Sequence, residues 1–299
     1  MLLESLESRR LMSVSLSAAG VLTVTGKNDP NPANGDHINI YVSGSNLKVN
    51  DNSAVSTFQL TKVKSLVVNL RAGDDNLTID PNVTLPSTID SGTATSFAGD
   101  VIQGGSGPDL IYLRSYYGLA KGGAGNDTLQ NLGGINILSG DGGDDVLINK
   151  AVGTTESKFA GGSGTDTIDY STATYNMILR NGQVGEYFLS NGAPVINGPG
   201  LPDAVETMEN FYSGSGNDYI YGTSGNNIIR AGAGKDQVRA GAGNDTINGG
   251  TGEDALFGED GNDTFYSKDS TKDFLSGGIG TDKANKDAID VINSVEASF

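Results

Sequence analysis

The sequence predicts an all-β fold in which short strands stack into a parallel solenoid. Two features of composition support this: glycine makes up 44 of 299 residues, and 27 of the 36 acidic residues are Asp rather than Glu. The third observation is a short motif that recurs every nine residues. Gly, Asn and Asp favour turns over helices. We therefore expect many short strands joined by tight turns, with helix limited to one or two turns at residues 204–211.

The repeat is clearest between Ser213 and Tyr266, where the chain divides into six consecutive nine-residue units. Glycine occupies the fourth position and an apolar residue the eighth position of all six units, and Asn227 replaces the usual Asp at the sixth. An earlier block keeps the same period, with Gly118 and Asn136 where Asp is expected. A disordered Gly/Asn/Asp linker remains an alternative, but linkers do not hold an apolar residue at every ninth position.

The spacing indicates how one unit folds. The apolar residue and its two neighbours form a short extended segment, and the Gly-rich residues then reverse the chain direction. Two units complete a turn of 18 residues, and successive turns stack at about 4.8 Å. This period places the acidic positions on two edges, with Asp218, Asp236 and Asp254 on one and Asn227, Asp245 and Asp263 on the other.

Stacked carboxylates point to a cation. Two carboxylates at this spacing repel by about 1 kcal/mol in water and by more in a shielded groove. Asp oxygens together with glycine-loop carbonyls form a hard, all-oxygen site that suits Ca²⁺ better than softer metals or Mg²⁺. The alternative is a metal-free solenoid whose Asp residues only cap turns. We favour this alternative for the isolated units at Asp75, Asp100 and Asp273.

The motif GGxGxDxUx, where U is a large apolar residue, appears as GGSGPDLIY from Gly104 and GGAGNDTLQ from Gly122. It resembles the RTX (hemolysin-type) calcium-binding repeat, over residues 95–148 and 213–285, under half of the chain. The resemblance implies a right-handed parallel β-roll or β-helix solenoid that binds several Ca²⁺ ions between successive turns. The implied carboxylate ligands are Asp109, Asp127, Asp145, Asp166, Asp218, Asp236, Asp245, Asp254, Asp263 and Asp282. The implied carbonyl ligands belong to Gly105, Gly107, Gly123, Gly125, Gly214, Gly216, Gly232, Gly234, Gly241, Gly243, Gly250 and Gly252.

Changes in pattern divide the chain into five parts. Residues 1–20, with Arg9 and Arg10, are expected to be an export segment or disordered, and residues 21–94 to be irregular solenoid rungs or a small β domain. Residues 95–169 form the first repeat block, residues 170–212 an inserted excursion, and residues 213–299 the second block with a C-terminal cap.

Several function classes are disfavoured. The absence of cysteine excludes disulfides, thiol catalysis and cysteine-bound metals, and no catalytic motif surrounds the lone His37, which we expect at an exposed strand end. A pI near 4.3 argues against nucleic acid as a partner. No apolar run of about 18 residues predicts a membrane span.

We therefore expect a calcium-binding protein that folds on binding its ions. The family resemblance implies a secreted, extracellular or cell-surface location, and we expect a non-enzymatic surface, matrix or adhesion component. The alternative is a polysaccharide-binding or polysaccharide-modifying protein, with cell-surface polysaccharide or matrix as the partner. Its support is the group of tyrosines in the excursion, including Tyr170, Tyr175 and Tyr187.

Overall fold

The computed structural model describes residues 12–27, 35–51, 54–93, 99–151, 157–181, 185–190, 193–196 and 203–299. In these ranges the only helical element is a 3-10 turn, η2 (Leu60–Lys62), and nearly all other regular structure is β-strand. The predicted all-β class is thus confirmed. No helix in the described ranges is long and apolar enough to cross a membrane. The predicted export segment at the extreme N-terminus lies outside the described residues up to residue 11.

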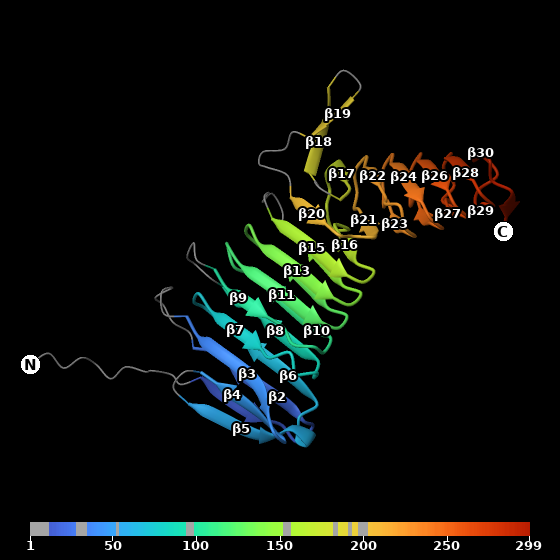
Figure 1. The fold of residues 1–299 in the computed structure, drawn as a ribbon. Helices are drawn as coiled ribbons and strands as arrows, with labels where there is room; N and C mark the ends of the chain where they lie inside the picture. The colour runs from blue at the N-terminus through green and yellow to red at the C-terminus, as the bar shows by residue number, and fades with distance from the viewer. Residues whose placement is uncertain are drawn as a thin grey trace, which may run out of the picture.

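The strands form three sheets (Figure 1). The 14-stranded sheet contains, in spatial order, β1 (Ser13–Leu16), β2 (Val21–Thr25), β6 (Ser65–Asn69), β8 (Ser87–Asp90), β10 (Asp109–Leu113), β12 (Thr128–Asn131), β14 (Val146–Asn149), β16 (Thr167–Asp169), β21 (Asn210–Tyr212), β23 (Ile228–Arg230), β25 (Thr246–Asn248), β27 (Thr264–Tyr266), β29 (Lys283–Asn285) and β31 (Ala297–Ser298).

Two shorter sheets alternate with it along the chain. The nine-stranded sheet contains β20 (Ala204–Glu206), β15 (Lys158–Ser163), β13 (Ile137–Gly142), β11 (Leu119–Ala124), β9 (Val101–Gln103), β7 (Asn76–Ile79), β3 (His37–Ser43), β4 (Asn46–Asn50) and β5 (Val55–Gln59). The eight-stranded sheet contains β19 (Ala193–Ile196), β18 (Gly185–Ser190), β17 (Met177–Leu179), β22 (Tyr219–Tyr221), β24 (Gln237–Ala242), β26 (Ala255–Asp260), β28 (Phe274–Ile279) and β30 (Val291–Asn293).

Register confirms the predicted parallel solenoid. Leu110 pairs with Thr128 and Thr246 pairs with Thr264, so neighbouring strands are one 18-residue turn apart. Insertions lengthen some turns, as in the pairing of Val146 with Thr167. We call the turns within residues 99–169 the first roll and those within residues 213–299 the second roll. The first roll shares its nine-stranded sheet with the N-terminal strands, and the second roll uses the eight-stranded sheet.

The core is one thin layer between facing sheets. Strands alternate buried and outward residues, and the eighth-position side chains are almost fully buried. In the 14-stranded sheet this buried row includes Ile111, Leu129, Leu147, Ile168, Phe211, Ile229, Ile247 and Phe265. Each such side chain contributes roughly 1.5–3 kcal/mol by leaving water. A single layer leaves little reserve for burying charge.

The structure corrects two expectations. Residues 204–211 form the two strands β20 and β21 joined by a short turn, not a helical turn. The fold begins earlier than residue 21, because β1 pairs antiparallel with β2. The N-terminal strands are rungs of the same solenoid, since β6 and β8 pair in parallel. The β18–β19 hairpin of the excursion projects from the solenoid (Figure 1).

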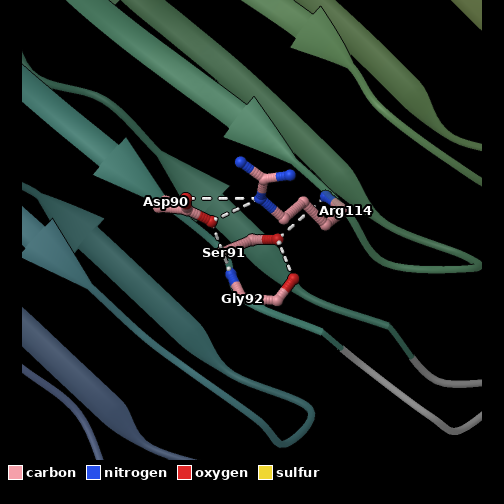
Figure 2. A network of polar contacts seen from close by, with 4 residues as sticks. All are labelled: Asp90, Ser91, Gly92 and Arg114. Carbon is pink, nitrogen blue, oxygen red and sulfur yellow. Dashed lines mark hydrogen bonds and ion pairs between the residues drawn. The ribbon is translucent and has the colours of Figure 1, made fainter. Parts of the chain in front are cut away.

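Some turns are held without any repeat motif. After β8, Gly92 N–H donates to Asp90 Oδ1 at 3.0 Å and Arg114 N–H donates to Ser91 Oγ at 3.0 Å (Figure 2). The Arg114 Nε–H donates to both oxygens of Asp90, at 2.9 and 3.3 Å. Here an arginine and a hydroxyl satisfy the turn. Among the described residues, no Lys or Arg forms an ion pair with the repeat aspartates described next.

Candidate metal centre

Aspartates of successive turns form hydrogen-bonded ladders. In the first roll, Asp109 N–H donates to Asp127 Oδ1 at 2.8 Å, and Asp127 N–H donates to Asp145 Oδ1 at 2.8 Å. Asp145 N–H continues to Asp166 Oδ1 at 2.9 Å. Each carboxylate therefore uses its Oδ1 atom to receive the backbone of the turn before it. We call each such series an aspartate ladder.

The second roll carries two ladders. One runs through Asp218, Asp236, Asp254 and Asp273, with N–H to Oδ1 distances of 2.7, 2.9 and 2.8 Å. The other starts at Asn227 and runs through Asp245, Asp263 and Asp282, with distances of 2.7, 2.9 and 2.8 Å. The structure thus brings the acidic positions together in two separate edge rows.

The second carboxylate oxygen, Oδ2, is buried and receives no hydrogen bond in most of these residues. Two predicted ligands differ: Asp109 Oδ2 accepts from Gly105 N–H at 2.9 Å, and Asp218 Oδ2 accepts from Ser213 Oγ at 2.7 Å. Both are the first aspartates of their ladders. The buried, unpartnered Oδ2 atoms belong to Asp75, Asp100, Asp127, Asp145, Asp166, Asp236, Asp245, Asp254, Asp263, Asp273 and Asp282.

Three residues in this set were expected to act only as turn caps. Asp75 N–H donates to Asp100 Oδ1 at 3.0 Å, and Asp273 Oδ1 accepts from Asp254 N–H, so these residues have ladder geometry. The sequence holds weak signals for two of them. Gly73 stands two residues before Asp75, and Asp273 follows Asp254 by 19 residues, one more than the period.

Glycines make room for the unpartnered oxygens. A Cβ atom at the first-position Gly122 or Gly258 would overlap Oδ2 of Asp127 or Asp263 in the same unit. A Cβ at the fourth-position Gly252 would overlap Gly234 O of the previous turn. Each loop therefore brings a carboxylate oxygen and a carbonyl oxygen of a neighbouring turn close to its glycines, where any other residue would overlap them.

The predicted carbonyl ligands are not equivalent. Gly105 O accepts from Ala124 N–H at 3.0 Å and Gly232 O accepts from Thr251 N–H at 2.8 Å, so second-position carbonyls already have one partner. No residue in the described part of the chain donates to the fourth-position Gly234 O. The fourth-position carbonyls also differ among themselves, because Gly252 O accepts from Thr271 Oγ1 at 2.7 Å.

This donor set fits Ca²⁺. No three acidic or histidine side chains converge within the described ranges, so an ion in a loop would take most of its ligands from the backbone. Hard carboxylate and carbonyl oxygens are the ligands that Ca²⁺ prefers. A bound Ca²⁺ would supply the positive charge that the buried Oδ2 atoms lack.

Comparison with known families reaches the same motif. The family model of the RTX calcium-binding nonapeptide repeat matches four times, at residues 96–114, 121–149, 212–247 and 239–269. The chain carries RTX calcium-binding repeats. The matches lie over both rolls, and they confirm the predicted resemblance and a calcium-binding β-roll. No curated protein matches the chain.

Burial dominates the electrostatics of the RTX ladders. The pKa values of Asp127 and of Asp236 are raised to about 8, chiefly by burial; the backbone hydrogen bond opposes this rise and the adjacent ladder carboxylates add to it. The pKa values of Asp245 and Asp254 rise to about 7 for the same main reason. Without a cation, these groups hold protons near neutral pH that an exposed Asp would have released.

The raised pKa values predict how the chelated protein responds to pH. Folded pKa values near 7 to 8 lie above the unfolded value near 3.8, so the folded state binds more protons between them. Stability in chelator should therefore fall as pH rises from 5 to 8, measured as the Tm. High salt screens repulsion between surface charges, so most of this decrease of Tm with pH should persist in high salt. A Tm that is flat or rises with pH would contradict the burial of these carboxylates.

Asparagine takes the ladder position in two turns, and its side-chain amide donates to nearby oxygens. Asn136 Nδ2 donates to Ser115 O at 3.0 Å, to Asn131 Oδ1 at 2.8 Å and to Gly133 O. Asn227 Nδ2 likewise donates to Glu209 O at 2.5 Å and to Thr223 Oγ1 at 2.9 Å. In each of these turns the N–H₂ group supplies hydrogen-bond donors to several oxygens, which an ionised Asp at the same position could not do.

Replacing Asn227 by Asp is expected to create a calcium site. The change removes the amide donor and places a carboxylate oxygen opposite Glu209 O and next to Thr223. Calcium bound per chain, counted by native mass spectrometry, should rise by one. The variant should be less stable than the parent in chelator. The control is Asn226→Asp, an exposed neighbour; an equal gain in that control would contradict the role given to the amide.

Proposed function

We propose that this chain is an exported, calcium-dependent folding module that acts outside the cell as a non-enzymatic surface, matrix or adhesion component. The observation that carries the proposal is the row of buried Oδ2 atoms without a partner. A buried carboxylate oxygen without a hydrogen bond costs several kcal/mol, and the thin core cannot offset many of them. Binding of Ca²⁺ in the RTX loops removes this cost.

The net charge and the position of the acidic residues along the solenoid support export. The net charge is −17 and the ladders concentrate much of it along narrow edges. Where calcium is scarce the ladders oppose folding, and where it is abundant they favour it. A chain of this kind stays loose inside the cell and folds outside. Proteins with these repeats are typically exported.

The tyrosines of the excursion do not favour the polysaccharide alternative. Tyr170 is 2% exposed, and its hydroxyl donates to Asp203 Oδ2 at 2.7 Å. Asp203 also accepts from Ser157 N–H and from Asn149 Nδ2, at 2.9 and 3.0 Å. Tyr170 therefore helps to fix the point where the excursion rejoins the solenoid and has no face for a sugar. The side chain of Tyr187 lies outside the described residues.

Limited proteolysis together with far-UV circular dichroism tests the proposal. At pH 8 and in Ca²⁺ the full chain should show a strong β signal and resist protease, and in chelator at the same pH it should lose most of both. Mg²⁺ should restore little, because it needs a smaller and more regular site. Identical cleavage and identical spectra in Ca²⁺ and in chelator would sink the proposal.

A further inference from the structure

Each roll ends in a shortened loop with a glutamate at the ladder position. At the end of the first roll, the next turn runs through Thr207, Met208 and Glu209 before β21 begins. In a regular turn, a Cβ on the first-position Gly122 would approach the carbonyl of Gly140, the first residue of the unit one turn later. A Cβ on Gly161 would approach the carbonyl of Thr207 in the same way. Thr207 thus takes the first position of a unit whose loop is three residues shorter.

Glu209 takes the sixth position of this short unit. Asp166 N–H donates to Glu209 Oε2 at 2.8 Å, as it would to the Oδ1 atom of a following Asp. The register agrees, because Thr167 pairs with Asn210 just as Thr128 pairs with Val146. The extra methylene of Glu restores the reach that the shortened loop removes.

The second roll ends in the same way. Ser294 O faces a Cβ placed on Gly277, and Asp282 N–H donates to Glu296 Oε2 at 2.7 Å. Both short loops turn through a left-handed residue that is not glycine, with φ of 54° at Thr207 and 50° at Ser294. Two loops far apart in sequence therefore have the same backbone conformation, and each carries a glutamate at the ladder position.

A buried oxygen without a partner faces each short loop. Asp166 and Asp282 have no exposed surface, and neither Oδ2 atom receives a hydrogen bond. A Cβ on Gly161 would meet both Thr207 O and Asp166 Oδ2, so these two oxygens lie on one side of that glycine. Burial raises the pKa of Asp166 and of Asp282, and the charge of Glu209 or Glu296 adds to this rise, in keeping with the hydrogen bond that brings each glutamate to the aspartate backbone.

We propose that each roll ends in a two-carboxylate calcium site, formed by Asp166 and Glu209 in the first roll and by Asp282 and Glu296 in the second. The carbonyl of Thr207 or Ser294 contributes a further oxygen. This inference rests on the proposed calcium binding and adds two sites outside the matched repeat stretches, which end at residues 149 and 269.

Two features distinguish these terminal sites from the inner ones. The glutamate is half-buried at Glu209 and exposed at Glu296, so the ions lie closer to solvent than those of the inner loops. The second difference is the short loop, which lacks glycine carbonyls; the glutamate keeps the carboxylate charge that an inner Asp supplies, and ligand charge tunes calcium affinity strongly. The series of acidic ladder residues is interrupted after Glu209, because the next ladder residue is Asn227, whose amide donates to Glu209 O.

Native mass spectrometry of the calcium-loaded full chain tests the inference. Glu209→Gln and Glu296→Gln keep an oxygen that accepts the aspartate N–H and remove one charge. Each should lose one retained ion, or weaken one site by about tenfold or more, and the double variant should lose two. The matched control is Glu206→Gln, an exposed residue on β20 three positions before Glu209. It should retain every ion.

The outcomes separate this inference from the proposed function. A parent chain that retains no calcium overturns both. A parent that retains several ions, with both Gln variants retaining the same number at unchanged affinity, overturns only the terminal sites. If Glu209→Gln fails to give the β spectrum of the parent, Glu296→Gln decides the result, because its turn is exposed at the end of the described solenoid.

Discussion

Replacing Ile247 by Asp is expected to prevent folding of the second roll even in excess Ca²⁺. Ile247 is fully buried in β25, between Ile229 and Phe265 of the neighbouring turns. A carboxylate there has no donor and no cation within the apolar row, and such a change costs about 4 kcal/mol or more. Far-UV circular dichroism in saturating calcium should show loss of much of the β signal.

The control for this variant lies on the same strand. Asn248 is the next residue and its side chain is exposed, so Asn248→Asp adds the same charge on the outer face. It should leave the spectrum and the calcium requirement close to those of the parent. A normal β signal in Ile247→Asp would contradict the inward placement of the eighth position.

Replacing Gly234 by Ala is expected to destabilise the second roll by about 3 kcal/mol or more. Gly234 has a φ of 138°, which side-chain-bearing residues rarely adopt. A Cβ there would also overlap Gly216 O of the preceding turn. The free energy of unfolding in calcium, measured by denaturant titration, should fall accordingly. Calcium affinity should fall as well, because the overlapped carbonyl borders a loop site.

Gly225 provides a matched comparison at the same position of its unit. A Cβ on Gly225 would have only Thr223 Oγ1 nearby, at 3.8 Å. Gly225→Ala should therefore cost little, although its motif position is the one that Gly234 holds. Equal losses in the two variants would mean that the repeat tolerates no side chain at this position for a reason other than carbonyl contact.

The regular part of the fold could be predicted because it is periodic. The nine-residue spacing of apolar residues determines which side chains are buried, and the 18-residue turn determines which aspartates share an edge. Asp236 and Asp254 stand one turn apart in the ladder for this reason. The N-terminal strands were harder to place, because their turns vary in length. Only pairing such as that of β6 with β8 shows that they belong to the solenoid.

The details of the site depend on contacts that periodicity does not encode. The motif treats Asp109 and Asp127 alike, yet Asp109 Oδ2 has a partner and Asp127 Oδ2 does not. Glu209 falls outside the nine-residue phase, because its loop is shortened, and only the hydrogen bond from Asp166 reveals its ladder position. The amide of Asn227 could be identified as a hydrogen-bond donor at the ladder position only after its acceptors were known.

A crystal structure of the calcium-loaded chain, with anomalous scattering used to locate the ions, tests the central claim most directly. The account predicts peaks beside the buried Oδ2 atoms of Asp127, Asp145, Asp236, Asp245, Asp254 and Asp263. It predicts no peak at the amide nitrogens of Asn136 and Asn227. Ions found only at exposed surface carboxylates, with the ladder oxygens still without a partner, would contradict it.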